Sequence, residues 1–146
     1  MRMANTDLKY GKLQVLVSTV LPAYRTNQFV IDTIQKIAGA ICKEDIKDAL
    51  IWNQGPLAKV DDLSDGKLGL FIAGIHSDVL YIDRKVVVGR QEGNGKRYTP
   101  SGDLVELATV VLLHELTHWA DDQDGNHAPG EAGFLFEKQV FGGIVN

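Results

Sequence analysis

The chain has 146 residues, of which 45% are hydrophobic and 23% are charged, and its formal net charge is −4. These values are ordinary for one soluble globular domain, so we expect a single domain over residues 1–146. There is no block of like charges, and therefore no electrostatic reason to expect nucleic acid or an anionic membrane as a partner. Cys42 is the only cysteine, which excludes an intrachain disulfide and a cysteine-rich metal site.

The first ten residues, Met1–Tyr10, are polar and lack the apolar core of a signal peptide. No apolar run approaches the ~18–20 residues needed to cross a bilayer. We therefore expect a protein that is made in the cytoplasm and does not insert into a membrane. If it acts elsewhere, it leaves without a cleavable signal peptide, or a leader is missing from this sequence.

The first half of the chain has mainly helical patterns. Leu13–Leu21 is an apolar run rich in valine, which is compatible with a helix or a strand. Asn27–Ala40 has apolar residues near helical spacing and predicts a helix, and Glu44–Trp52 predicts a second, shorter one. Gly55-Pro56 then breaks the helical pattern.

The middle of the chain changes to strand patterns. Leu68–Ile75 and Val79–Val88 are short, rich in β-branched residues and bounded by turn residues, so both are predicted as strands. Gln91–Lys96 contains two glycines and an asparagine, which indicates a hairpin or a loop tip.

Two helices are predicted at the end of the chain. Ser101 is a plausible N-cap, and the apolar residues of Leu104–Ala120 cover most of a helix surface, as in a helix buried within a core. This helix should end near Gly125. Pro129 suits the first turn of another helix, running to Val140. Helices, a small sheet and two further helices predict an α+β domain.

The motif most indicative of function is H-E-x-x-H, formed by His114, Glu115 and His118. On a helix, positions i and i+4 lie about 40° apart in azimuth and one turn apart in height, so both imidazoles can bind one metal ion. Zinc lowers the pKa of a water that it binds towards ~7, and a neighbouring carboxylate takes the proton as this water attacks a carbonyl. Glu115 is placed for that role.

A catalytic zinc site needs a third protein ligand and one open position. Glu137 follows His118 after 18 residues, a spacing that resembles the gluzincin peptidases, including the thermolysin-like and aminopeptidase families. From the histidines to the helix end is about 10 Å, and an antiparallel helix starting near Pro129 returns to their level near Glu137. Glu131, at the mouth of that helix, could also reach His118 or support a ligand. We favour Glu137.

Three aspartates compete with these glutamates. Asp124 stands six residues after His118, where the metzincin peptidases place their third ligand. Asp121 or Asp122 could instead accept a hydrogen bond from a ligand imidazole and fix its tautomer. The alternative for each aspartate is a solvated helix end.

A few residues outside the motif could stabilise the oxyanion that forms during hydrolysis. Zincin peptidases commonly use a histidine or a tyrosine for this purpose, and the candidates are His127, Tyr81 and Tyr98. His127 is otherwise an exposed loop residue, and the tyrosines are otherwise core or surface residues. We assign no role to His76.

The segment Val110–Gly143, VVLLHELTHWADDQDGNHAPGEAGFLFEKQVFGG, resembles the zincin domains of bacterial polymorphic toxins and type VI secretion effectors. The shared elements are H-E-L-x-H-W, an acidic loop, E-x-G-x-x-x-E and F-G-G. The resemblance implies a zincin-like fold in which a strand, here Val79–Val88, edges the cleft and pairs with an extended substrate. It implies zinc held by His114, His118 and a glutamate, with Glu115 as the general base.

These features predict a zinc-dependent metallopeptidase. A secreted antibacterial toxin or effector is one role that such an enzyme could have. The substrate would be a peptide or protein, including a peptidoglycan peptide, and an immunity protein would be a partner. The alternative is a non-catalytic zinc-binding module that recognises a partner through a zincin fold. A structural zinc that joins the last two helices through a fourth protein ligand is a further alternative.

Overall fold

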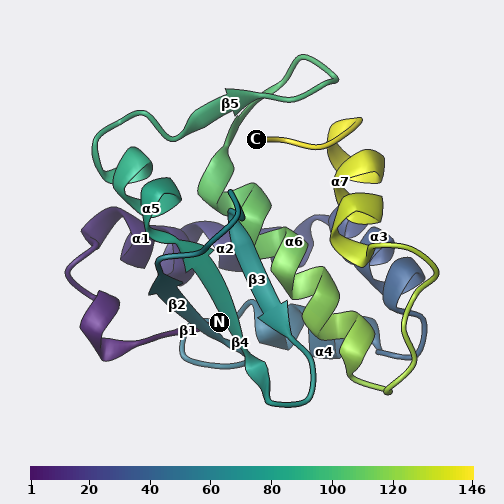
Figure 1. Cartoon of the computed structure of the whole chain (residues 1–146). Helices are drawn as coiled ribbons and strands as arrows, with labels where there is room; N and C mark the ends of the chain where they lie inside the picture. The colour runs from purple at the N-terminus through teal and green to yellow at the C-terminus, as the bar shows by residue number, and fades with distance from the viewer.

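The computed structural model describes residues 1–146 and has an α+β architecture, which confirms the expected fold class (Figure 1). The strands are β1 (Arg2–Met3), β2 (Leu57–Asp61), β3 (Gly69–Ile72), β4 (His76–Asp83), β5 (Lys96–Tyr98) and β6 (Leu104–Glu106). The α-helices are α1 (Gly11–Val15), α2 (Leu21–Ala23), α3 (Gln28–Ala38), α4 (Lys43–Ala49), α5 (Arg84–Gln91), α6 (Leu107–Asp122) and α7 (Ala132–Phe141). Three short helical segments of other types are η1 (Asn5–Asp7), η2 (Leu16–Val20) and η3 (Tyr24–Thr26).

The main sheet is small and mixed. Its strand order is β1-β2-β4-β3, with β1, β2 and β4 parallel and β3 antiparallel to β4. The register of β3 on β4 shifts between Phe71 and Ile72. Because β4 lies between β2 and β3, the sequence-based expectation that Val79–Val88 forms the edge of the cleft is wrong, and β3 is the edge strand. Strands β5 and β6 form a separate two-stranded hairpin (Figure 1).

Helix α6 runs through the middle of the molecule (Figure 1). It packs against β3 and β4 on one side and against α3 and α7 on the other. Most of its residues are buried, and side chains such as Leu112 and Leu116 are fully enclosed. The expected buried helix is therefore present. It ends at Asp122, and α7 then returns alongside it towards its beginning.

The strand predicted at Val79–Val88 is half strand and half helix. Strand β4 ends at Asp83, whose side chain accepts the main-chain N–H of Lys85 at 2.8 Å and so caps α5. Val86 and Val87 are buried on this helix. Burial against the core thus overrides the preference of β-branched residues for a strand.

The helix expected from Leu104 starts three residues later, because Leu104–Glu106 is strand β6 and pairs with β5. Ser101 therefore does not cap α6, whose N-cap is Glu106. It lies in the turn between the two strands, and its hydroxyl donates to the carbonyl oxygen of Phe141 at 3.1 Å.

Other boundaries differ less from expectation. The ambiguous run Leu13–Leu21 is helical, through α1, η2 and the start of α2. Gln91–Lys96 contains the loop that joins α5 to β5 and is not a hairpin tip. Helix α7 begins after Glu131, its N-cap, and not at Pro129. No helix is both long and apolar enough to span a membrane.

Candidate metal and active site

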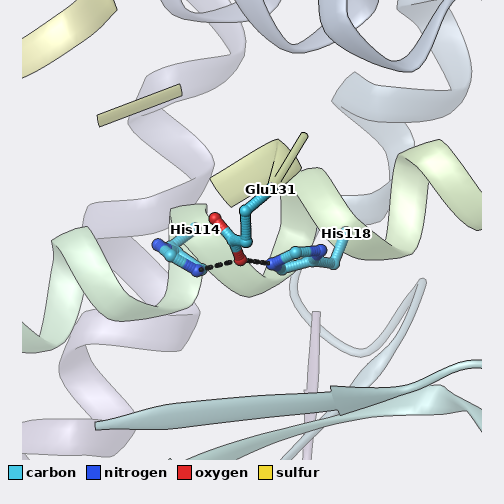
Figure 2. Close-up of side chains that lie close together, drawn as sticks. All are labelled: His114, His118 and Glu131. Atoms are coloured by element: carbon cyan, nitrogen blue, oxygen red, sulfur yellow. Dashed lines mark hydrogen bonds and ion pairs between the residues drawn. The ribbon is translucent and has the colours of Figure 1, made fainter. Parts of the chain in front are cut away.

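Helix α6 presents His114 and His118 one turn apart on the same face. Both imidazoles point towards one carboxylate oxygen of Glu131 (Figure 2). The Nε2 atom of His114 lies 3.2 Å from Oε1 of Glu131, and Nε2 of His118 contacts the same oxygen. The possible ligand atoms of these three residues lie within 4.8 Å of one another. The two histidines and one glutamate therefore form a group able to hold a metal ion.

The carboxylate of Glu131 is held in place by the start of α7. Its Oε2 atom accepts the main-chain N–H of Phe134, which leaves Oε1 directed at the histidines. The preceding loop is anchored by Asp121, a buried residue of α6 whose two oxygens lie 2.9 and 3.1 Å from the main-chain N–H of Ala128. Helix capping and this anchor together position Glu131 beside α6.

Glu137 contacts the other ring nitrogen of His114. Its buried Oε1 lies 2.6 Å from Nδ1 of His114, and its Oε2 accepts the main-chain N–H of Val145 at 2.6 Å. Glu137 is thus not one of the three residues whose atoms converge. A carboxylate in contact with this ring nitrogen can orient the imidazole and set its tautomer.

Glu115 is buried beside the two histidines, with Oε1 4.0 Å from Nε2 of His114. Burial, reinforced by the charges of Glu131 and Glu137 and opposed by His114, raises the pKa of Glu115 to about 7. Strand β3 lies directly over this carboxylate, because a Cβ atom on Gly69 would be 2.4 Å from Oε1. Glycine at this position therefore makes the close approach of β3 to Glu115 possible.

The two histidines have different electrostatic surroundings. Burial lowers the pKa of His114, but the hydrogen bond to Glu137 and the charges of Glu115, Glu131 and Glu137 outweigh it, and the net pKa is raised. Burial also lowers the pKa of His118, and here the nearby carboxylates do not compensate. Three carboxylates around His114 thus favour a positive charge at this place.

The site opens into a cleft of about 500 Å³. Its floor is α6, one wall is β3 with the preceding loop, and the other wall is α7 with the residues that follow it. Several apolar side chains line it, including Leu70, Phe134 and Ile144. Phe134 and Ile144 are about half exposed, so the wall beside the histidines presents apolar surface. An extended chain could lie in this cleft against the free edge of β3.

The remaining candidates from the sequence lie elsewhere. Asp124 accepts the N–H of Asn126 at 2.9 Å in the loop after α6 and does not join the converging group. The side chain of His127 is 62% exposed, and its Nδ1 lies 3.8 Å from Asp121. The residues that line the cleft do not include Asp122, His127, Tyr81, Tyr98 or His76.

Sequence reasoning gave no role to two glycines, Gly69 and Gly133, although Gly133 is the glycine of the E-x-G-x-x-x-E element. A Cβ atom on Gly133 would lie 2.1 Å from Nε2 of His114, much as one on Gly69 would meet Glu115. The sequence did contain an indication for Gly133. A glycine inside a predicted helix costs ~1 kcal/mol relative to alanine, which suggests that a close contact or another function keeps it there. Gly69 stands within the predicted strand, where glycine marks a close approach.

The donor atoms fit a divalent transition metal. Two imidazole nitrogens and one carboxylate oxygen, with an open cleft on the remaining side, are the ligand set of catalytic zinc sites. The neighbouring carboxylates Glu115 and Glu137 add negative charge that a cation would neutralise. The residues therefore suit a bound metal ion.

An α+β fold with an H-E-x-x-H helix and a converging glutamate defines a candidate metallohydrolase. The family model of metallopeptidase toxin 3 matches residues 6–142, so the chain belongs to this family of metal-dependent peptidase toxins. This agrees with the resemblance to polymorphic-toxin metallopeptidases seen in the sequence. No curated protein and no solved structure matches the chain.

Proposed function

We propose that the protein is a zincin-type zinc metallopeptidase in which His114, His118 and Glu131 hold Zn²⁺. The observation that carries this proposal is the convergence of both Nε2 atoms on one oxygen of Glu131. Glu137 then orients His114, in place of the ligand role that its spacing in the sequence favours. Membership of the metallopeptidase toxin 3 family supports a metal-dependent peptidase.

Glu115 acts as the general base in this proposal. Zn²⁺, when bound, supplies a Lewis acid and lowers the pKa of water. The Glu115 carboxylate, buried next to His114, accepts a proton from the attacking water and passes it to the leaving amide nitrogen. Burial raises the pKa of Glu115 to about 7 in the metal-free protein, and a cation bound beside it would favour the ionised form that takes the proton. Burial of Glu115 beneath β3 keeps its position fixed.

The substrate is an extended peptide or protein chain that pairs with the free edge of β3. The short strand offers unpaired main-chain groups beside the cleft, which is the requirement for strand addition. The half-exposed Phe134 and Ile144 are placed to contact its side chains. A peptidoglycan peptide is the second substrate to be tested, because the family is one of toxins.

Membership of a toxin family also supports a proposal about how the protein is delivered and neutralised. We infer that the protein acts as a secreted toxin and that an immunity protein neutralises it. The whole range 1–146 acts as one domain, which is supported by a single hydrophobic cluster that draws residues from Met1 to Val145.

Measuring the metal content of purified variants tests the proposed zinc site. We expect one zinc per chain by mass spectrometry in the wild type, and its loss in His118→Ala and Glu131→Ala. Glu137→Ala should still bind zinc, with lower affinity. Loss of zinc in Glu137→Ala but not in Glu131→Ala would reverse the roles of the two glutamates. A wild-type protein that stays metal-free when zinc is supplied would refute the proposal.

Hydrolysis tests the role of Glu115. Zinc-loaded wild type and Glu115→Gln are compared on unstructured proteins and on peptidoglycan peptides. Glu115→Gln should keep its zinc and lose turnover, while Glu92→Gln, which lies outside the cleft, should retain it. A zinc-loaded wild type that cleaves neither substrate class would favour a non-catalytic zinc-binding module.

A further inference from the structure

We propose that the segment Gly142–Val145, which we call the C-terminal strap, positions His114 through Glu137. The contact that matters most is the hydrogen bond from the main-chain N–H of Val145 to Oε2 of Glu137. This inference rests on the proposed metal site, but it concerns residues that do not touch the metal. It makes Glu137 and Val145 positioning residues for the first histidine of the motif.

The argument begins with the two oxygens of Glu137. Each faces one donor at 2.6 Å, namely Nδ1 of His114 and the N–H of Val145. An ionised carboxylate accepts hydrogen bonds only, and a buried oxygen without a donor is costly. Because Val145 occupies Oε2, Glu137 cannot rotate without breaking that bond. Its Oε1 is therefore held towards His114.

The effect on His114 follows from this geometry. With Nδ1–H donating to Glu137, the Nε2 atom faces Glu131, and once it has released its proton it presents a lone pair to a metal ion on that side. The orientation of the ring and the choice of tautomer are thus set by Glu137. Loss of the Val145 N–H would free the carboxylate to turn and would release both constraints.

The strap is itself held by the turn between β5 and β6. Gly142 ends α7 with a φ of +79°, and a Cβ atom there would lie 2.1 Å from Oγ of Ser101. The Ser101 hydroxyl donates to the carbonyl oxygen of Phe141 at 3.1 Å. Beyond Gly142, the side chain of Val145 is buried in the core. A continuous series of contacts therefore leads from Ser101 to His114.

Two substitutions separate the N–H of Val145 from its side chain. Val145→Pro removes the N–H and keeps an apolar side chain. Val145→Ala keeps the N–H and removes buried methyl groups. We expect Val145→Pro to weaken zinc binding by about 10- to 100-fold in chelator competition. We expect Val145→Ala to lower the melting temperature but to change zinc affinity by less than about 3-fold.

A second readout observes His114 directly. In zinc-loaded wild type, the Nδ1 proton of His114 should give a slowly exchanging NMR signal, because it is buried and hydrogen-bonded. Val145→Pro and Glu137→Gln should both make it exchange rapidly with water. Glutamine has a single acceptor oxygen and cannot serve both donors. The double variant should be no worse than the more severe single variant, since both act through one path.

Proline also restricts Ile144, so the folding of Val145→Pro is checked by circular dichroism. If it does not fold, the amide-to-ester variant at Val145, made with the α-hydroxy analogue of valine, removes the N–H alone. Zinc affinity and proton exchange equal to wild type in either folded variant would overturn the strap proposal and leave the metal site standing. Failure of the wild type itself to bind zinc would instead overturn the proposed function.

Discussion

Gly133 on α7 faces the imidazole of His114 on α6 so closely that no side chain fits between them. An added Cβ would lie 2.1 Å from both Nε2 and Cδ2 of the ring. The ring has little freedom to retreat, because Nδ1 is held by Glu137 and Nε2 faces Glu131. This contact joins the two helices beside the proposed metal site.

Gly133→Ala should therefore weaken zinc binding, by at least about 10-fold, because the ring must move away from its orienting partner. Alanine is the better helix former by ~1 kcal/mol, which partly offsets a clash of ~1–3 kcal/mol in the metal-free protein. Chelator competition measures the affinity. Gly89→Ala is the matched control, since its nearest neighbour would be at 3.8 Å. An unchanged affinity in Gly133→Ala would contradict the proposed site.

Gly69→Ala should reduce turnover while zinc remains bound. The new Cβ would meet Oε1 of Glu115 at 2.4 Å and Cγ1 of Val111 at 2.8 Å, so the carboxylate that we propose as general base must shift. A general base contributes typically 10²–10⁴-fold, and we expect kcat to fall by about 10²-fold. Peptidase assays with zinc analysis on the same sample check this. Gly11→Ala, where a Cβ meets nothing within 4 Å, should behave as wild type.

Asp121→Ala should loosen the loop that brings Glu131 to the histidines. Both oxygens of this buried carboxylate lie near the N–H of Ala128, and their loss leaves that donor without its partner. We expect a loss of ~1–3 kcal/mol in the free energy of unfolding and weaker zinc binding. Asp121→Asn keeps one acceptor oxygen, so its free energy of unfolding and its zinc affinity should lie between those of the wild type and of Asp121→Ala. If Asp122→Ala has the same effects, the loop anchor is not their cause.

The contribution of Glu115 to the stability of the metal-free protein should fall as the pH rises from about 4.5 to 7. Burial raises the pKa of Glu115 to about 7, whereas an unfolded glutamate titrates near ~4.3. In this window Glu115 keeps its proton in the folded state and has released it in the unfolded state, so its contribution to the free energy of unfolding falls with increasing pH. The loss from Glu115 is on the order of 3 kcal/mol.

Urea unfolding of the metal-free wild type and of Glu115→Gln, between pH 4.5 and 8, measures this effect. The advantage of Glu115→Gln over the wild type should grow across the window, since glutamine does not titrate. The difference reports Glu115 together with its coupling to His114. Parallel stability profiles would show that Glu115 is not held in its protonated form by the fold.

The local part of the site could be predicted from sequence, because the spacing of His114 and His118 is set by one helix. The choice between Glu131 and Glu137 could not. Both contact the same imidazole, one at Nε2 and one at Nδ1, and residue spacing does not distinguish the two ring nitrogens. The hydrogen bond from Val145 that occupies Glu137 is a tertiary contact with no sequence pattern.

In the fold, too, local sequence patterns predicted some elements, and tertiary contacts determined others. The buried α6 was predictable because its apolar residues surround the helix axis. The change from strand to helix at Asp83 depends on a side-chain cap and on burial of Val86 and Val87, where tertiary packing overrides local preference. The two-residue strand β1 pairs with β2 more than fifty positions away, and nothing local marks it.

The free edge of β3 has a second consequence, for self-association. An exposed strand edge accepts any extended chain, including the same strand of another copy. Here the strand has only four residues, and its register shifts at Phe71 and Ile72. Shortness and irregularity are features that limit edge-to-edge aggregation. Lengthening β3 to strengthen the proposed pairing with a substrate would therefore be expected to reduce the solubility of the protein.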